Sequence, residues 1–293
     1  MEYLKYGLQN NELVHINEVA SGLECNCICP FCKSQLIARK GQKKTYHFAH
    51  YRLSDCNHGT ETALHIMVKK LVAQTKKIWV PFTPQNIYDD SENGKVVCFE
   101  TAEIEKQLSD AIRSDVLLHR GDRALNVEIK VTHEVDLSKQ IELFNFGVST
   151  VEIDFSDMRF SFSPELILQR LMEGSHTKLL FSPKCKDICA KKMLGEWKKI
   201  YSNSYVEDCP MTFKRAYFVD YLGKGGPAEC HECCGWEECD RSKGKILCRG
   251  LLGNFDFKQI EQIIEIRKEE GHLRYIKLLL KDGNVLERTF DRR

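Results

Sequence analysis

The sequence lacks a long apolar segment, a secretory signal and a strong excess of either charge. No apolar run in the 293-residue chain approaches the roughly 20 residues that a membrane-spanning helix needs. Residues 1–6 contain no apolar signal-peptide core, so we expect a cytosolic protein without membrane attachment. The formal net charge is +1, so no global basic field attracts nucleic acid. We also expect no exposed aromatic motif of the stacking type, which disfavours a zinc-dependent RNA-binding factor.

Cysteine, in contrast, is abundant. The chain has 14 cysteines, and in the reducing cytosol such numbers indicate metal binding rather than disulfide bonds. Most of them gather in two zones near the ends of the chain. A chain of this length accommodates one large or two to three small domains. We expect a zinc-binding module at 1–58, a core at 59–174 and a cysteine-rich domain at 175–293.

The first cysteine zone predicts a structural zinc site. It begins with a CPFC knuckle and continues through a predicted hairpin over residues 35–46. Thiolates and imidazoles at this spacing close a tetrahedral Zn²⁺ site with no open position. The candidate ligands are Cys29, Cys32, His47, His50 and Cys56. We expect both knuckle cysteines to bind with two of the other three, one histidine plus Cys56 being favoured, whereas Cys25 and Cys27 are expected to be buried thiols.

The centre of the chain predicts a β-hairpin with an acidic face. A two-residue turn at 121–122 contains glycine, which tolerates a positive φ. Counting outward from this turn places Asp115 opposite Glu128, and alternation puts Lys130 on the same face. The expected strands are 112–118 and 125–131, with Val116 paired to Val127 and Ile112 to Val131 on the other face.

This acidic face predicts a catalytic metal site. Two carboxylates that face each other repel, and a divalent cation between them removes the repulsion. Carboxylate pairs that hold Mg²⁺ or Mn²⁺ beside an ammonium group are suited to phosphodiester hydrolysis. In this interpretation Asp115 and Glu128 bind the metal, and Lys130 orients the attacking water. The alternative is a surface hairpin whose polar face is only solvated.

A helix is predicted over residues 60–75, where apolar residues recur at helical spacing. Glu61, His65 and Lys69 line a second face of it. Glu61 is the candidate to complete the catalytic metal shell, and the alternative is a carboxylate favoured by the helix macrodipole. Further elements are expected at 96–99 (strand), 137–146 (helix) and 148–155 (strand). The order of three strands, a helix and a strand predicts an α+β fold with a mixed central sheet and flanking helices.

Positive charge is unevenly distributed. Residues 33–52 contain six Lys or Arg and no acid, and more lysines follow on the helix at 60–75 and just after it. These are Lys69, Lys70, Lys76 and Lys77. A basic zinc module beside an acidic metal site suits a phosphodiester backbone. The alternative is an ordinary solvated surface.

Residues of both regions also carry a family resemblance. They are the Cys29–Cys32 knuckle, the segment 36–41 (LIARKG), His47, His50, Cys56, Glu61, His65 and Lys69. With them the chain resembles the CoiA-like competence protein family over roughly residues 20–156. The resemblance implies a zinc module followed by a nuclease core of the PD-(D/E)XK type. Asp115, Glu128 and Lys130 match the core motif, with Ser114 in place of its proline, and a role in DNA processing during uptake or recombination is implied.

The second cysteine zone predicts a second metal site. The candidate ligands are Cys209, Cys230, Cys233 and Cys239, and a Zn²⁺ site with four thiolates is the favoured assignment. Their Cys-x2-Cys-x5-Cys spacing also resembles the iron–sulfur staple of RecB-related nucleases, so a 4Fe-4S cluster is the alternative. We also expect a helix at 257–269 and a hairpin around 282–284.

These observations favour a Mg²⁺- or Mn²⁺-dependent deoxyribonuclease that hydrolyses DNA phosphodiester bonds in processing linked to competence or recombination. One or two structural Zn²⁺ sites would support it, and DNA and recombination proteins are the expected partners. The competing hypothesis is a non-catalytic, zinc-containing DNA-binding or recombination adaptor with a degenerate nuclease core. The intact set of Asp115, Glu128 and Lys130 favours the enzyme.

Overall fold

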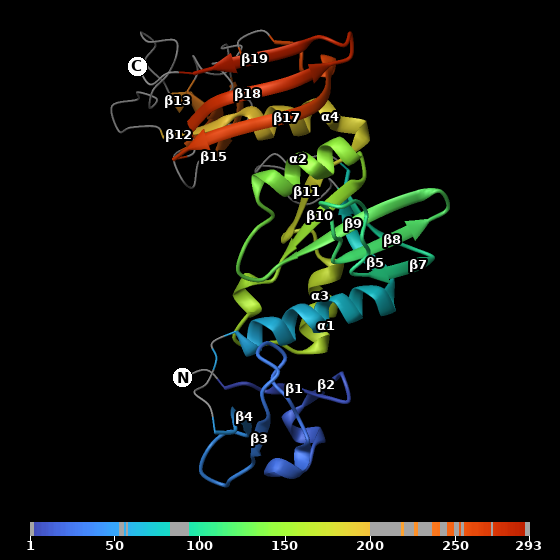
Figure 1. Cartoon of the computed structure of the whole chain (residues 1–293), viewed down its shortest axis with the longest axis vertical. Coiled ribbons are helices and arrows are strands. Elements are labelled where there is room, and N and C mark those ends of the chain that lie inside the picture. The colour runs from blue at the N-terminus through green and yellow to red at the C-terminus, as the bar shows by residue number, and fades with distance from the viewer. Residues whose placement is uncertain are drawn as a thin grey trace. The chain divides into compact units, whose positions relative to one another are not determined.

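The computed structural model describes residues 3–52, 56, 58–82, 94–199, 218–219, 226–227, 236–240, 245–248, 252, 255–270 and 272–290. The succession of elements can be followed in Figure 1. The chain divides into two compact units. One contains Met1–Trp79, Val96–Val135 and Glu152–Thr177, and the other contains Val80–Lys95, Asp136–Val151 and Lys178–Arg293. The expected division into three domains stays a prediction.

The N-terminal region is built from two small antiparallel hairpins. The first pairs β1 (Tyr6–Gln9) with β2 (Glu12–His15), and the second pairs β3 (Leu36–Arg39) with β4 (His47–His50). Short 3₁₀ turns, Ile16–Glu18 and Leu23–Cys25, lie between them in the sequence. An apolar cluster fills the space between these elements: Ile16, Val19, Cys25, Cys27, Cys29, Leu36, Ala38 and Phe48. A hairpin is therefore present, but its second strand begins at His47, beyond the predicted range 35–46. Cys25 and Cys27 are buried thiols as expected.

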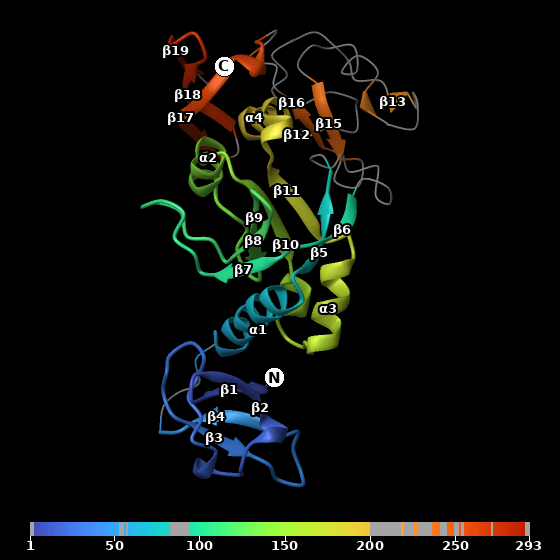
Figure 2. The same ribbon diagram turned by 90° about the vertical axis from the view of Figure 1, so that its right-hand side faces the viewer.

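Helix α1 (Gly59–Thr75) agrees with the predicted helix within one residue. Its apolar face is buried, and its last turn closes at Lys76, which takes a left-handed conformation with φ of 50°. Helix α1 packs against β7, β8 and α3, as Figure 2 shows for α1 and α3. The helix thereby presents its polar residues, four apart along one side, to the strands that carry the predicted acidic motif.

A five-stranded sheet forms the centre of the fold, in the order β11-β10-β9-β8-β7. Its strands are β7 (Thr101–Ile104), β8 (Val116–Arg120), β9 (Arg123–Lys130), β10 (Ser149–Asp154) and β11 (Thr177–Phe181). The first three form an antiparallel meander. Strand β10 follows β9 through helix α2, the kind of crossover that makes a sheet mixed. The α+β class with a mixed sheet is as predicted. The strand expected at 96–99 corresponds to β6 (Gly94–Cys98), which lies outside this sheet, and β7 takes its place in the meander.

The β8–β9 hairpin has the predicted register at its turn. Val116 pairs with Val127, and Arg120 with Arg123 across the 121–122 turn, where Gly121 has φ of 55°. The first strand is shorter than expected, because β8 begins at Val116. The preceding backbone bonds to the other side: Ser114 N–H donates to Lys106 O at 2.9 Å. The predicted pairing of Ile112 with Val131 was therefore wrong, because Ile112 lies before the paired part of β8.

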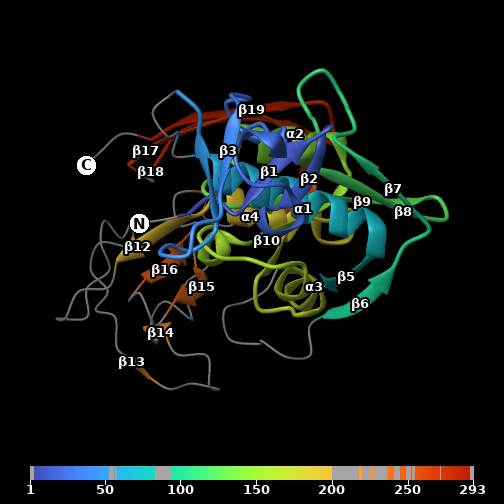
Figure 3. The same ribbon diagram turned by 90° about the horizontal axis from the view of Figure 1, so that it is seen from below.

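The helices around the sheet have clear local stop and start signals. Helix α2 (Leu137–Phe146) has the predicted bounds; Asp136 caps its first turn, and Gly147 ends it with φ of 82°. Helix α3 (Pro164–Met172) begins with a Ser163 cap, after a 3₁₀ turn at Ser156–Met158. Strands β5 (Lys77–Pro81) and β6 (Gly94–Cys98) form a separate two-stranded sheet, which Figure 3 shows from below.

The C-terminal part of the chain is mainly β-structure where it is described. A 3₁₀ turn (Pro183–Cys185) leads into α4 (Lys186–Leu194). One small sheet has the order β12-β16-β15, and another the order β17-β18-β19. The strands are β12 (Glu196–Lys199), β13 (Phe218–Val219), β14 (Gly226–Pro227), β15 (Trp236–Asp240), β16 (Lys245–Cys248), β17 (Ile260–Glu269), β18 (His272–Leu280) and β19 (Val285–Thr289). The hairpin predicted around 282–284 connects β18 to β19.

The helix predicted at 257–269 was wrong, since a 3₁₀ turn (Phe257–Gln259) and strand β17 occupy this segment. Ile260, Ile263 and Ile266 are buried at intervals of three, which imitates a helical period. The interval arises because irregularities in the β17–β18 pairing shift the side-chain alternation after Ile260 and again after Ile263. The β-branched isoleucines favour the strand.

Among the described residues, no helix is both long enough and apolar enough to span a membrane.

Candidate functional site

Four of the five predicted zinc ligands come together in one group. The ligand atoms of Cys29, Cys32, His50 and Cys56 all lie within 4.8 Å of one another. Sγ of Cys29 is 3.5 Å from Sγ of Cys56, and Nε2 of His50 is 3.2 Å from Sγ of Cys32. Around tetrahedral Zn²⁺, such ligand pairs are expected to lie about 3.6–3.8 Å apart. This set, the zinc group below, therefore fits a structural zinc ion.

The local backbone explains how these ligands converge. The knuckle turns tightly, because Cys29 N–H donates to Ser34 O at 2.8 Å and Lys33 takes a left-handed φ of 60°. The β3–β4 ladder then pairs His50 with Leu36, just beyond the knuckle. His47 sits at the other end of the same strand. Its Nδ1 lies 2.8 Å from Thr45 O, so it is outside the zinc group.

The two knuckle thiols differ in acidity. Burial raises the pKa of the Cys29 thiol to about 12. At Cys32 burial also acts to raise the pKa, but hydrogen bonds with Ser34 outweigh it and lower the pKa to about 6. A zinc ion deprotonates the thiols that coordinate it, so its binding must release the proton of Cys29 and become weaker as the pH falls.

The predicted catalytic residues lie at the open end of the β8–β9 hairpin. Asp115 is one residue before β8, next to the Val116–Val127 pair, and its carboxylate accepts a hydrogen bond from Ile129 N–H at 2.9 Å. This bond ties Asp115 to the backbone between Glu128 and Lys130. The structure thus brings Asp115 to the Glu-x-Lys segment. The β8–β9 ladder ends at the Val116–Val127 pair, so the facing of the Asp115 and Glu128 carboxylates stays a prediction.

Helix α1 supplies two further partners of Asp115. Nζ of Lys69 lies 2.9 Å from Oδ1, and Nε2 of His65 lies 3.1 Å from Oδ2. Lys69 also contacts Glu105 at 3.0 Å, and Glu105 in turn contacts Arg113. Burial alone would raise the pKa of Asp115, but the His65 hydrogen bond and the charges of His65 and Lys69 hold it well below its ordinary value. Asp115 is therefore an ionised carboxylate in a cationic setting.

Glu128 is positioned by two polar residues that the sequence reasoning did not select. Ser114 Oγ donates to Asn126 Oδ1, and Asn126 Nδ2 donates to Glu128 Oε1 at 2.9 Å. All three residues are buried, Glu128 with 3% of its surface exposed. Ser114 stands where the resembling motif has proline, so this departure adds a hydrogen-bond chain that orients Glu128. Asn126 is detectable in the sequence only as a polar residue two positions before Glu128, on the same face of the strand.

Lys130 and Glu61 have partners of their own. Nζ of Lys130 lies 2.9 Å from Oδ2 of Asp154 on β10, and this hydrogen bond raises the pKa of Lys130. Glu61 accepts from His58 at 3.2 Å and lies 4.0 Å from Arg159. Asp115 instead contacts His65, Lys69 and the Ile129 N–H, so the place of Glu61 in a metal shell stays a prediction.

The lysines of α1 do not all face solvent as the basic-surface interpretation assumed. Lys69 is buried in its contacts with Asp115 and Glu105. Lys70 pairs with Glu12 at 2.6 Å. The physical reason is that acidic groups far away in the sequence fold against this helix and neutralise its lysines. The basic character of residues 33–52 is unaffected by this correction.

The second cysteine zone is described only in part. Cys209, Cys230 and Cys233 lie outside the described residues, as does the side chain of Cys239 in β15. Cys185, Cys189 and Cys248 are buried. The choice between zinc and a 4Fe-4S cluster in this zone therefore stays a prediction.

The comparisons with known proteins bear on the N-terminal region. Residues 9–59 match the family model described as "Competence protein CoiA, N-terminal domain". The match includes the whole zinc group and confirms the resemblance to the CoiA-like competence protein family over this N-terminal segment. No curated protein and no solved structure matched the chain.

Proposed function

We propose that this protein is a Mg²⁺- or Mn²⁺-dependent deoxyribonuclease that acts in DNA processing linked to competence. The observation that carries the proposal is the bond from Ile129 N–H to the Asp115 carboxylate at 2.9 Å. It holds one carboxylate against the segment that bears the second, Glu128, and the ammonium of Lys130. The order α1, three antiparallel strands, α2 and β10 supports a nuclease core of the PD-(D/E)XK type.

The donor set fits a hard divalent cation. Asp115 and Glu128 would contribute two oxygen ligands to the cation. They would form a pair only, because the zinc group is the one cluster of three or more close metal-type ligands in the described part of the chain. Mg²⁺ prefers one or two carboxylates, with water and phosphate at its other positions. When bound, such a cation supplies an activated water and stabilises charge on the scissile phosphate.

The surrounding residues have separable roles in this proposal. Asn126 and Ser114 fix the Glu128 carboxylate by hydrogen bonds. Asp154 keeps Lys130 protonated, because its hydrogen bond raises the pKa of the ammonium. A protonated lysine cannot act as a general base, so Lys130 would orient the attacking water and stabilise negative charge. Lys69 and His65 would have to release the Asp115 carboxylate when the cation binds.

A non-catalytic adaptor is the second candidate, and one observation favours it. Both carboxylate oxygens of Asp115 already have protein partners: Lys69 on one, His65 and Ile129 N–H on the other. Such a satisfied ion-pair cluster is also what a degenerate nuclease core, kept only for its structure, would contain.

Cleavage assays separate the two candidates. The zinc-loaded chain is incubated with linear and circular, single- and double-stranded DNA, with Mg²⁺, with Mn²⁺ or with neither. We expect metal-dependent cleavage that Glu128→Gln and Lys130→Ala each reduce at least about 100-fold, since each removes a group that acts on the transition state. The matched control is Glu103→Gln, a β7 carboxylate paired with Lys106 and His119, which should cleave normally. Wild-type rates from Glu128→Gln would move the active centre elsewhere or favour the adaptor.

A further inference from the structure

Two aromatic rings project from the surface where the zinc group adjoins α1. Phe31 lies inside the CPFC knuckle, and 51% of its surface is exposed. Phe160 lies between β10 and α3, and 53% of its surface is exposed. Single large apolar side chains with this much exposure are common on protein surfaces. These two are instead joined by a continuous series of contacts.

The series runs through polar side chains. The ring of Phe31 is centred 5.0 Å from that of His58, and Nδ1 of His58 lies 3.2 Å from Glu61. Glu61 lies 4.0 Å from Nη1 of Arg159, whose guanidinium carbon is 4.1 Å above the ring of Phe160. We call these five residues the aromatic strip. It links the zinc module, the start of α1 and the segment before α3.

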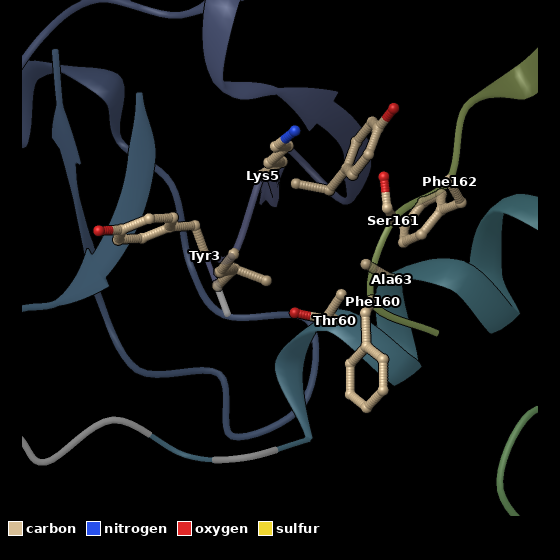
Figure 4. A pocket seen from close by; sticks show the side chains of 9 residues that line it. Tyr3, Lys5, Thr60, Ala63, Phe160, Ser161 and Phe162 are labelled. Atoms are coloured by element: carbon tan, nitrogen blue, oxygen red, sulfur yellow. The ribbon is translucent and has the colours of Figure 1, made fainter. Parts of the chain in front are cut away.

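The segment that carries Phe160 is packed against the N-terminal region. Phe162, two residues on, stacks on Tyr6 with ring centres 4.9 Å apart. Phe160 itself lines a small pocket with Thr60 at the start of α1. Figure 4 shows that Phe160 and Phe162 point to different sides of their segment, with Phe160 beside Thr60. The exposed ring of Phe160 therefore extends from a well-packed segment. This packing limits the conformational entropy that is lost when a ligand binds.

The electrostatic setting favours an anionic ligand. Glu61 is the one acid of the aromatic strip, and the guanidinium of Arg159 lies 4.0 Å from it. The neighbouring zinc module contributes six Lys or Arg and no acid between residues 33 and 52. Flat aromatic surface flanked by cations is the combination that binds single-stranded nucleic acid: bases stack on the rings, and phosphates pair with the cations. In a duplex, the faces of the bases are already stacked on one another and cannot reach the rings.

We propose that the aromatic strip binds single-stranded DNA, with bases stacked on Phe31 and Phe160 and the backbone held by Arg159 and the basic zinc module. The inference rests on the proposed function, because it names the strand type on which that nuclease core acts. It assigns the zinc module a role in substrate binding besides its structural one.

Binding of the zinc-loaded full chain to fluorescein-labelled oligo(dT), followed by anisotropy without Mg²⁺ or Mn²⁺, tests this. The same experiment with a duplex of equal length gives the strand preference. We expect the single strand to bind more tightly, Phe160→Ala to weaken it roughly tenfold and Phe160→Tyr to retain it. The matched control is Phe82→Ala, because Phe82 is also 53% exposed and has Lys95 5.9 Å from its ring but lies outside the strip.

A second variant guards against misfolding. Phe31→Ala should also weaken oligo(dT) binding. Its zinc content is measured in parallel and should equal that of the wild type, which shows that the weaker binding comes from the lost ring and not from loss of zinc. Wild-type affinity in both alanine variants, or an equal loss in Phe82→Ala, would overturn the inference. Oligo(dT) binding without Mg²⁺ or Mn²⁺ reports on the strip, whereas the cleavage assays report on the proposed function. The two can therefore fail separately.

Discussion

The zinc group and the Asp115 cluster differ in the protein groups that face their ligand atoms. In the zinc group, three thiols and one imidazole face one another, with Ser34 as a neutral neighbour. In the Asp115 cluster, an ammonium and an imidazole from α1 already contact the carboxylate. The first is a set of soft ligands that a cation completes. The second carries its own positive charge.

The difference teaches how each region should depend on metal. The zinc group depends on a cation to hold its four ligands together, so the fold of residues 9–59 should require zinc. The Asp115 carboxylate is stabilised by Lys69, so the core should fold without a divalent cation. A cation there competes with Lys69 and should bind weakly and reversibly. We therefore expect zinc to act on folding and Mg²⁺ or Mn²⁺ to act on chemistry.

The largest expected effect is loss of the zinc group. Cys29→Ser should remove one zinc ion per chain and unfold the N-terminal module, because structural zinc contributes on the order of 10 kcal/mol to such modules. Elemental analysis measures the zinc, and limited proteolysis measures the exposure of residues 9–59. Cys98→Ser is the matched control, since Cys98 is exposed on β6. Full zinc content in Cys29→Ser would contradict the assignment.

A smaller effect is expected from removing the internal cation. Lys69→Met should destabilise the chain by about 3 kcal/mol without divalent cations, because it leaves the half-buried Asp115 carboxylate short of a charge partner. Mg²⁺ should then restore more stability than it adds to the wild type. Denaturant unfolding with and without Mg²⁺ measures both. Lys70→Met, which breaks only the exposed pair with Glu12, should change stability by less than about 1 kcal/mol. Equal effects of the two variants would show that Lys69 does not balance the site.

The smallest expected effect is a dependence on pH. The pKa of folded Asp115 lies below its ordinary value of about 4. Its contribution to stability is therefore fully present above pH 4 and is lost as the pH falls through the lowered pKa. Without divalent cations, Asp115→Asn should reduce the unfolding free energy on the order of 2 kcal/mol at pH 7. Urea titrations at pH 7 and pH 3 should show the difference shrinking; a constant difference would mean that the folded pKa is not lowered.

Local signals in the sequence were sufficient for several elements. The Asp136 cap and Gly147 define α2, and the 121–122 turn sets the β8–β9 register. In both cases the determining residues lie within a few positions of the structure they specify. In β17 the local signal misled, because irregular pairing placed buried isoleucines three apart and a helical period resulted.

The sequence was sufficient to predict which residues belong to the candidate sites, but not all of the contacts that these residues make. Spacing supplied the zinc ligands, and the choice between His47 and His50 depends on which end of β4 meets the knuckle. The contacts of Asp115 with His65 and Lys69 join residues 50 and 46 positions apart in the sequence. No local pattern specifies such pairs; they follow from how α1 packs on the sheet.

The most direct test of the central claim is the effect of Mg²⁺ on thermal unfolding of the wild type and Glu128→Gln. Both are melted in buffer without chelator, so that zinc stays bound, first without Mg²⁺ and then with a large excess. At about 100 times the dissociation constant, a bound cation stabilises the folded chain by about 2.7 kcal/mol. The account predicts a rise of several degrees in the wild type and none in Glu128→Gln. An equal rise in both proteins, or no rise in the wild type, would contradict the claim that Asp115 and Glu128 hold a divalent cation.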